Sequence, residues 1–176
     1  SVMPVRDAIG RLAARGALNV EPKRAVAVPT LRRDEFRDLT RNRIHLESRA
    51  TELAAKNGMD AVALQTAEQR FRSALDRNDA KEAVRANKAL HFLVYEAAGS
   101  PVLMELVTIM WLKAGPVINL DLGEQSRRSR HSISLKCHTR FVSALLDGDS
   151  ETAAEALAQD IRSAAEFILS RNILPE

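Results

Sequence analysis

Four polar side chains occupy positions that helical periodicity assigns to the interior of the protein. Asn87 and His91 are four residues apart, so they project from adjacent turns of one helix face. His138 and Asp160 fall within the apolar series of two further predicted helices. Burying an unpaired polar group costs roughly 2–7 kcal/mol, so all four need partners. The three series are Val84, Asn87, His91, Val94, Ala98; His138, Phe141, Val142, Leu145; and Leu157, Asp160, Ile161, Ala164, Ile168.

One divalent metal ion would satisfy these four groups together. Two imidazoles, a carboxylate and an amide oxygen suit Zn²⁺, Ni²⁺ or Mn²⁺ and leave coordination positions open. Taken singly, His91 or His138 is better explained as a core histidine with a hydrogen-bond partner, and a buried Asp160 could pair with an arginine. The pattern therefore predicts a metal site, with a metal-free polar network as the alternative.

A metal-dependent enzyme is the alternative from another functional class, because two histidines and an aspartate around an ion can activate water. The sequence contains no G-x-S-x-G, H-E-x-x-H or G-x-G-x-x-G motif. The predicted interior faces also offer no further carboxylate or histidine that could serve as a general base. We therefore expect no catalytic residue and no enzymatic activity.

Arg43 is a further polar residue on an apolar face, between Leu39 and Leu46 of the first long helix. At the edge of a pocket its guanidinium could hold the carboxylate of a small ligand in a bidentate pair. It could equally form an ion pair with Glu47, one turn later on the same helix. Both interpretations remain open from the sequence.

These residues lie in a chain whose patterning is mainly helical. We expect an all-α fold, an antiparallel bundle of six to seven helices with short connections, because apolar residues recur at three and four and Gly, Asp and Pro separate the segments. Before the bundle, a helix that ends at Gly16 is followed by two short strands around a basic turn. The bundle helices are predicted at about 34–56, 60–77, 79–98, 101–121, 128–147 and 149–171.

Charge and composition exclude several classes of protein. Residues 1–33 carry seven basic and two acidic residues, whereas the rest of the 176 residues carries 19 basic and 21 acidic ones. A basic segment before a mildly acidic body is typical of a nucleic-acid-binding piece joined to another domain, although a solvated face would look similar. The single cysteine, Cys137, excludes an internal disulfide and a thiolate metal cluster. The longest apolar stretch, 102–112, contains Glu105, so we expect no membrane partner.

Several ordered motifs resemble the FadR subfamily of GntR-type transcription regulators, whose effector-binding domain is called FCD. Pro4-Val5-Arg6-Asp7-Ala8-Ile9 with Leu12 and Gly16 is similar to the family's recognition helix, and Lys23-Arg24-Ala25-Val26 is similar to the tip of its wing. The remaining matches are Arg43-Ile44-His45-Leu46-Glu47, Asn87-Lys88-Ala89-Leu90-His91 with Ala97-Ala98-Gly99-Ser100, and His138 with Ala144-Leu145, Gly148-Asp149 and Ala153-Ala154.

The resemblance implies a function for each part of the chain. Residues 1–30 would be part of a winged helix-turn-helix, beginning at the recognition helix, and residues 31–176 an FCD-like domain that binds a divalent metal and a small organic acid. The metal would lie on Asn87, His91, His138 and Asp160, where Asn87 replaces the usual Asp and Asp160 the usual third His. The implied DNA contacts are Ser1, Val2, Met3, Arg6, Lys23 and Arg24, the last two on the wing.

The implied protein is a cytoplasmic homodimer that binds double-stranded operator DNA and more often represses than activates. A small carboxylate effector, held in part by Arg43, would change the orientation of the two DNA-binding heads. Val2 stands where the family usually has Arg, so the operator would differ from the usual one.

Overall fold

The computed structural model describes the backbone of residues 2–20, 25–122 and 127–176, with the side chains of these residues except 119–122 and 127–132. This part of the chain forms seven helices and one two-stranded sheet, in the order that the sequence predicts. The helices are α1 (Val2–Ala14), α2 (Arg33–Asn57), α3 (Ala61–Asp76), α4 (Ala80–Ala97), α5 (Pro101–Leu122), α6 (Arg127–Leu146) and α7 (Ser150–Ser170), and the strands are β1 (Asn19–Val20) and β2 (Val26–Ala27).

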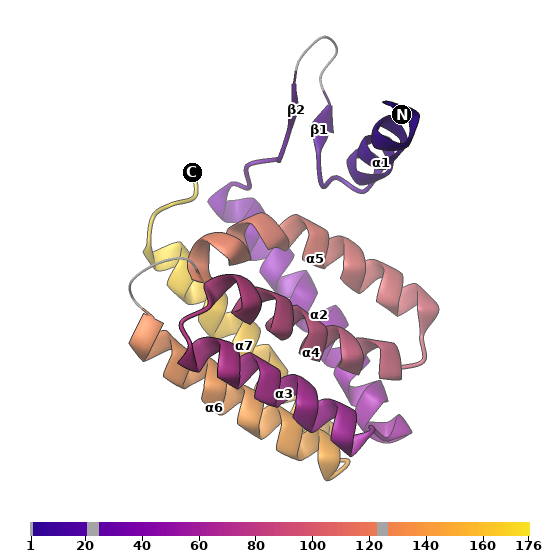
Figure 1. Ribbon diagram of the computed structural model, residues 1–176, viewed down its shortest axis with the longest axis vertical. Coiled ribbons are helices and arrows are strands. Elements are labelled where there is room, and N and C mark those ends of the chain that lie inside the picture. The colour runs from indigo at the N-terminus through magenta and orange to yellow at the C-terminus, as the bar shows by residue number, and fades with distance from the viewer. Residues whose placement is uncertain (1, 21–24, 123–126) are drawn as a thin grey trace.

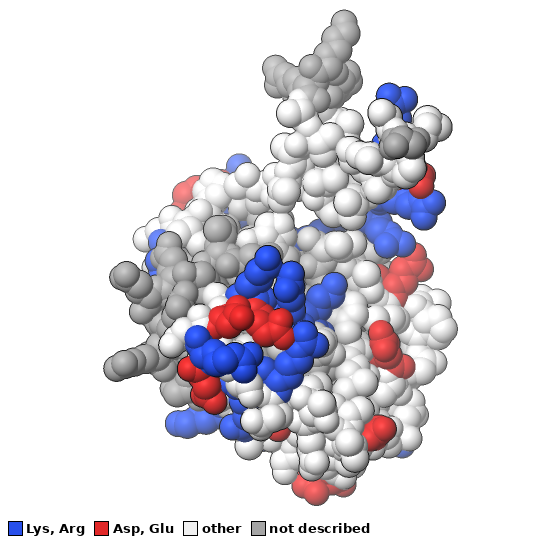
Figure 2. All heavy atoms as spheres, viewed as in Figure 1, with Lys and Arg blue, Asp and Glu red and all other residues white. Residues whose placement is uncertain are grey.

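The amino-terminal helix and hairpin stand beside the bundle rather than within it (Figure 1). α1 has no buried residue, and β1 pairs with β2 in antiparallel register, Val20 opposite Val26. Figure 2 shows Lys and Arg side chains around α1 with an acidic group beside them, and basic and acidic groups intermixed over the middle of the bundle face. The helix and hairpin predicted for 1–30 are therefore present, and their role as half of a winged helix-turn-helix stays a prediction.

Helices α2 to α7 form the predicted bundle, in which α2 packs against α7, α5 and α4, while α6 packs against α7 and α3 against α4 (Figure 1). Aspartate N-caps fix the starts of three helices: Asp60 for α3, Asp79 for α4 and Asp149 for α7. Between α6 and α7 the chain reverses at Gly148, whose φ of 70° is unfavourable for other residues. The all-α prediction and the short helix connections are confirmed.

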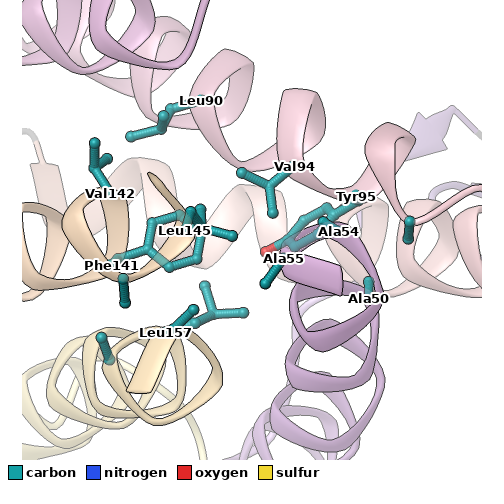
Figure 3. Close-up of a cluster of buried hydrophobic side chains, with 14 of the residues drawn as sticks. Ala50, Ala54, Ala55, Leu90, Val94, Tyr95, Phe141, Val142, Leu145 and Leu157 are labelled. Atoms are coloured by element: carbon teal, nitrogen blue, oxygen red, sulfur yellow. The ribbon is translucent and has the colours of Figure 1, made fainter. Parts of the chain in front are cut away.

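The core lies where α2, α4, α6 and α7 meet (Figure 3). Small residues of α2, such as Ala50 and Ala54, are fully buried and allow the neighbouring helices to approach closely. Larger side chains from α4 and α6, among them Leu90, Tyr95 and Phe141, fill the space between the helices. In Figure 3 the hydroxyl of Tyr95 points into the middle of this cluster, so a polar group enters an otherwise apolar core.

Helix α5 is more apolar than its neighbours. The window Pro101–Ile118 has a mean hydropathy of 1.4, so by length and composition alone this helix is long and apolar enough to cross a membrane. In the structure 17% of the window is buried. Its inner face is part of the bundle, since Val107 and Trp111 are packed in the main core. The outer face leaves Val102 and Leu106 exposed. α5 is thus a core helix of the bundle on one side and an apolar surface on the other.

Candidate metal and effector site

Three helices bring His91, His138 and Asp160 together, as the apolar series predict. His91 comes from α4, His138 from α6 and Asp160 from α7, and one potential ligand atom of each lies within 4.8 Å of the others. The Oδ2 atom of Asp160 is 3.5 Å from Nε2 of His138 and 3.8 Å from Nε2 of His91. Both rings therefore direct Nε2 at the same carboxylate oxygen. Among the described residues, the basic side chains that approach the Asp160 carboxylate this closely are these histidines, not the arginine considered from the sequence.

Burial and mutual proximity shift the pKa values of this cluster. Burial, followed by the neighbouring His138, lowers the pKa of His91 to about 3. Burial alone would raise the pKa of Asp160, but the nearby His138 and His91 outweigh it and lower that pKa to about 2. At neutral pH the cluster therefore holds a carboxylate and a neutral His91.

His138 is buried without a hydrogen-bond partner. Its side chain is 1% exposed, and neither Nδ1 nor Nε2 has a partner among the described residues. The 3.5 Å to Asp160 is too long for a good hydrogen bond. Phe71 covers the ring, with the two ring centroids 4.5 Å apart. Because buried polar atoms are nearly always paired, a buried nitrogen that faces a carboxylate at this distance is one that a cation could satisfy.

A small cavity opens beside the three ligands. It measures about 50 Å³, and its lining includes Asn87, His91, Asp160 and Ser134. Ser134 donates a hydrogen bond of 3.1 Å to Oδ1 of Asp160, which leaves Oδ2 to face the histidines. Asn87 is half-buried on the same face of α4 as His91, and it lines this cavity together with His91 and Asp160.

The donor set and spacing fit a divalent metal. Two ligand atoms each about 2.1 Å from an ion, at the tetrahedral angle, lie about 3.4 Å apart. The two separations between Asp160 and the histidines, 3.5 and 3.8 Å, are close to that value, and the ligand atoms of all three residues lie within 4.8 Å of one another. Two imidazole nitrogens, one carboxylate oxygen and the Asn87 amide oxygen would leave room for exchangeable ligands on Zn²⁺, Ni²⁺ or Mn²⁺.

Arg43 lies on the wall of the same cavity and is paired with Glu47. Its Nε donates to Oε1 of Glu47 at 2.7 Å, and its Nη2 donates to Oε2 at 3.3 Å. The guanidinium carbon lies 5.0 Å from the ring centroid of Trp111, close enough for a cation–π contact. The ion pair that the sequence allowed is therefore present, and Arg43 also borders the space where a ligand would sit.

Glu47 is the functional residue whose importance the sequence did not reveal. Its side chain is fully buried, and besides Arg43 it accepts hydrogen bonds from the Tyr95 hydroxyl at 2.5 Å and from Trp111 Nε1 at 3.0 Å. The Tyr95 oxygen in turn lies 3.1 Å from Nδ1 of His91. A continuous polar chain therefore links Arg43 to the cluster of His91, His138 and Asp160. A buried Tyr on the His91 face, one turn away, is the signal that could have indicated it.

The remaining predicted residues belong to the amino-terminal part. Val2 and Met3 are each 70% exposed on α1, and Arg6 is exposed on the same helix. Ser1, Lys23 and Arg24, the other predicted DNA contacts, lie outside the described residues. His45 is exposed and Cys137 is half-buried.

Known proteins share both the sequence pattern and the fold. The FCD domain family matches residues 38–163. The HTH-type transcriptional regulator McbR of Escherichia coli (strain K12) is 27% identical over 161 residues, which are 90% of this chain and 72% of McbR. The solved structure of E. coli McbR/YncC superposes with a TM-score of 0.90 at 24% identity, covering 97% of this chain and 81% of that one.

A second solved structure extends the likeness beyond McbR. A transcriptional regulator of the GntR family from Pseudomonas syringae pv. tomato str. DC3000 has a TM-score of 0.59 at 24% identity, over 97% of this chain and 70% of its own. The family match spans most of the chain and includes His91 and Arg43, with His138 and Asp160 near its end. The chain therefore belongs to the FCD domain family as a GntR-type transcription regulator, and the relatives that it matches are transcription regulators rather than enzymes.

Proposed function

We propose that this regulator binds a divalent metal in its helical domain, on His91, His138 and Asp160 with Asn87 as a further ligand. The observation that carries the proposal is the buried His138, whose two ring nitrogens lack partners although Nε2 faces the Asp160 carboxylate at 3.5 Å. A metal ion would satisfy Nε2 of both imidazoles and the carboxylate at once. When bound, it would act as a Lewis acid that holds an anionic ligand in the cavity.

The charges around the cavity favour a small carboxylate as the effector. Arg43 and Glu47 neutralise each other, so a divalent ion beside the single carboxylate of Asp160 leaves one net positive charge. A monoanion would neutralise it, and Arg43 on the cavity wall could donate to that anion as well. The cavity of about 50 Å³ exceeds the roughly 10–15 Å³ that one water needs, so it suits a very small organic acid.

The amino-terminal part is proposed to bind operator DNA. The exposed Val2, Met3 and Arg6 of α1 would contact the major groove as the family's recognition helix does, and Ser1, Lys23 and Arg24 complete the proposed contacts. Two copies would present two such helices to a palindromic operator, and the exposed apolar side chains of α5 support self-association. The proposed protein is thus a cytoplasmic homodimer that represses by occupying its operator.

The test measures binding of full-length protein to labelled DNA from upstream of its own gene. We expect a specific complex of one dimer per site, weakened when Zn²⁺ and a small carboxylate such as acetate are added together. Arg6→Ala should weaken binding, whereas Arg41→Ala, an exposed arginine of the bundle, should not. Sedimentation checks the dimer. Absence of sequence-specific binding would refute the DNA-binding proposal, and binding that ignores the metal and all carboxylates would refute the effector proposal.

A metal-free polar network is the remaining alternative for the bundle. In that case Asp160 and the histidines would share protons instead of an ion. The same DNA-binding assay in the presence of a chelator distinguishes the two, because a metal-free effector site would respond to carboxylates without Zn²⁺.

A further inference from the structure

We infer that Tyr95 and Glu47 act as positioning residues that fix the tautomer of His91. In this tautomer the ring hydrogen stays on Nδ1, and Nε2 presents its lone pair to Asp160 and the cavity. The inference deepens the proposed function, and the role that it gives to the tautomer rests on the proposed metal site, because an imidazole binds a metal only through an unprotonated nitrogen. The tautomer itself follows from hydrogen-bond directions that hold with or without an ion.

The argument begins at Glu47, which can only accept. Its buried carboxylate is surrounded by donors: Nε and Nη2 of Arg43, the indole Nε1 of Trp111 and the hydroxyl of Tyr95. Guanidinium and indole groups have no acceptor atom, so both contacts require lone pairs on Glu47. The carboxylate form satisfies all of them, and its charge is balanced by Arg43 at 2.7 Å.

The next step fixes the hydrogen of Tyr95. A phenol carries one hydrogen, and the 2.5 Å contact with Oε2 of Glu47 is the short distance expected when a hydroxyl donates to a carboxylate. Toward any other neighbour the Tyr95 oxygen can then only accept. The neighbour at 3.1 Å is Nδ1 of His91, so Nδ1 must be the donor.

The last step places the lone pair of His91. Whenever the ring is neutral it carries one hydrogen, and the Tyr95 contact assigns that hydrogen to Nδ1. Nε2 is then a bare acceptor 3.8 Å from the Asp160 carboxylate, with no hydrogen between two electron-rich atoms. Between Nε2 of His91 and the Asp160 carboxylate, a cation would therefore be more favourable than a hydrogen bond. His138 gives the contrast, since neither of its ring nitrogens has a partner among the described residues.

The polar chain also joins the two halves of the proposed site. Arg43 reaches the proposed effector space, while His91 reaches the proposed metal, and Glu47 with Tyr95 lies between them. Outer-shell partners of this kind typically change metal affinity about 10–100-fold when removed. Tyr95→Phe should therefore act on the metal although Tyr95 itself is no ligand.

The first measurement is the tautomer of His91 in the metal-free full-length protein. Two-bond ¹H–¹⁵N correlation spectra of ¹⁵N-histidine-labelled protein distinguish protonated from bare ring nitrogens, and the signals that disappear in His91→Gln are those of His91. We expect Nδ1 protonated and Nε2 bare in wild type. In Tyr95→Phe, Nδ1 loses its acceptor and the hydrogen should move toward Nε2, where Asp160 can accept it. Wild-type protein with its hydrogen on Nε2 would overturn the inference, as would a Tyr95→Phe spectrum identical to wild type.

The second measurement is Zn²⁺ affinity by competition with a chromophoric chelator. Tyr95→Phe should bind about 10–100-fold more weakly than wild type. Thr51→Val is the matched control, because it also removes a fully buried hydroxyl, one that donates to the Glu47 backbone carbonyl at 2.9 Å. The control should keep both the tautomer and the affinity. Equal loss in both variants would overturn the role of Tyr95, whereas a wild type that binds no Zn²⁺ but shows the predicted tautomer would refute the proposed metal and leave the tautomer assignment standing.

Discussion

Arg43→Met tests whether Arg43 and Glu47 form a buried ion pair that stabilises the fold. Arg43 and Glu47 have side chains 9% and 0% exposed, so removing the guanidinium leaves a buried carboxylate whose remaining hydrogen-bond donors among the described side chains are Tyr95 and Trp111. Breaking one partner of such a pair typically costs about 3–5 kcal/mol. For a chain of this length each kcal/mol lowers Tm by about 2–4 °C, so the expected drop is about 6–20 °C.

The assay is urea and thermal denaturation followed by circular dichroism, with chelator present in every sample. Arg41→Met is the matched control, because its ion pair with Asp38 is exposed, 68% and 65%, and such pairs contribute at most about 1 kcal/mol. The double variant Arg43→Met/Glu47→Gln should recover part of the loss, since no charge remains unpaired. The assignment of Arg43 and Glu47 as a buried, mutually dependent pair would be refuted if Arg43→Met were as stable as Arg41→Met. It would also be refuted if the double variant lost more stability than Arg43→Met and Glu47→Gln lose together.

Three further predictions concern the metal-ligand cluster and a helix cap. In the metal-free protein the pKa of His91 is lowered to about 3, so as the pH falls below the usual histidine pKa of about 6.5 the unfolded chain takes up a proton that the folded protein does not. The free energy of unfolding, measured by urea titration, should therefore fall by up to about 1.4 kcal/mol for each pH unit as the pH is lowered from about 6 to about 4. This part of the slope should vanish in His91→Gln and persist in the exposed His45→Gln. Zn²⁺ at about 100 times its Kd should add about 2.7 kcal/mol to wild-type stability in the same titration and nothing to His138→Ala, so equal stabilisation of both would contradict the site. Asp149→Ala removes the 3.0 Å cap to the Thr152 amide and should cost about 1 kcal/mol, whereas Asp147→Ala should cost little.

The helices could be predicted from the sequence because each one carries its own apolar series and its own stop. The Asp149 cap and the turn at Gly148 follow from local chemistry that a short window contains. The convergence of His91, His138 and Asp160 could also be predicted, since a polar residue in each inward series of an antiparallel bundle must point to the shared interior. The backbone periodicity alone therefore located the candidate metal ligands.

The polar chain behind His91 could not be predicted in the same way, because it depends on contacts between distant residues. Glu47 is 48 residues from Tyr95 and 64 from Trp111, and only the packing of α2, α4 and α5 brings them together. In the sequence, Tyr95 and Trp111 are indistinguishable from ordinary aromatic core residues. The sequence likewise left open whether Arg43 serves Glu47 or a ligand, and the structure shows the pair while placing Arg43 on the cavity wall.

The most direct test of the account is elemental analysis of full-length protein purified without a chelator. Wild type should contain about one equivalent of a transition metal per chain, with Zn²⁺, Ni²⁺ or Mn²⁺ as the expected ions. His91→Ala/His138→Ala should contain none, whereas the exposed His45→Ala should match wild type. Wild type that stays metal-free after incubation with each of these ions, or a double variant that retains the full equivalent, would contradict the central claim that His91, His138 and Asp160 form a metal site.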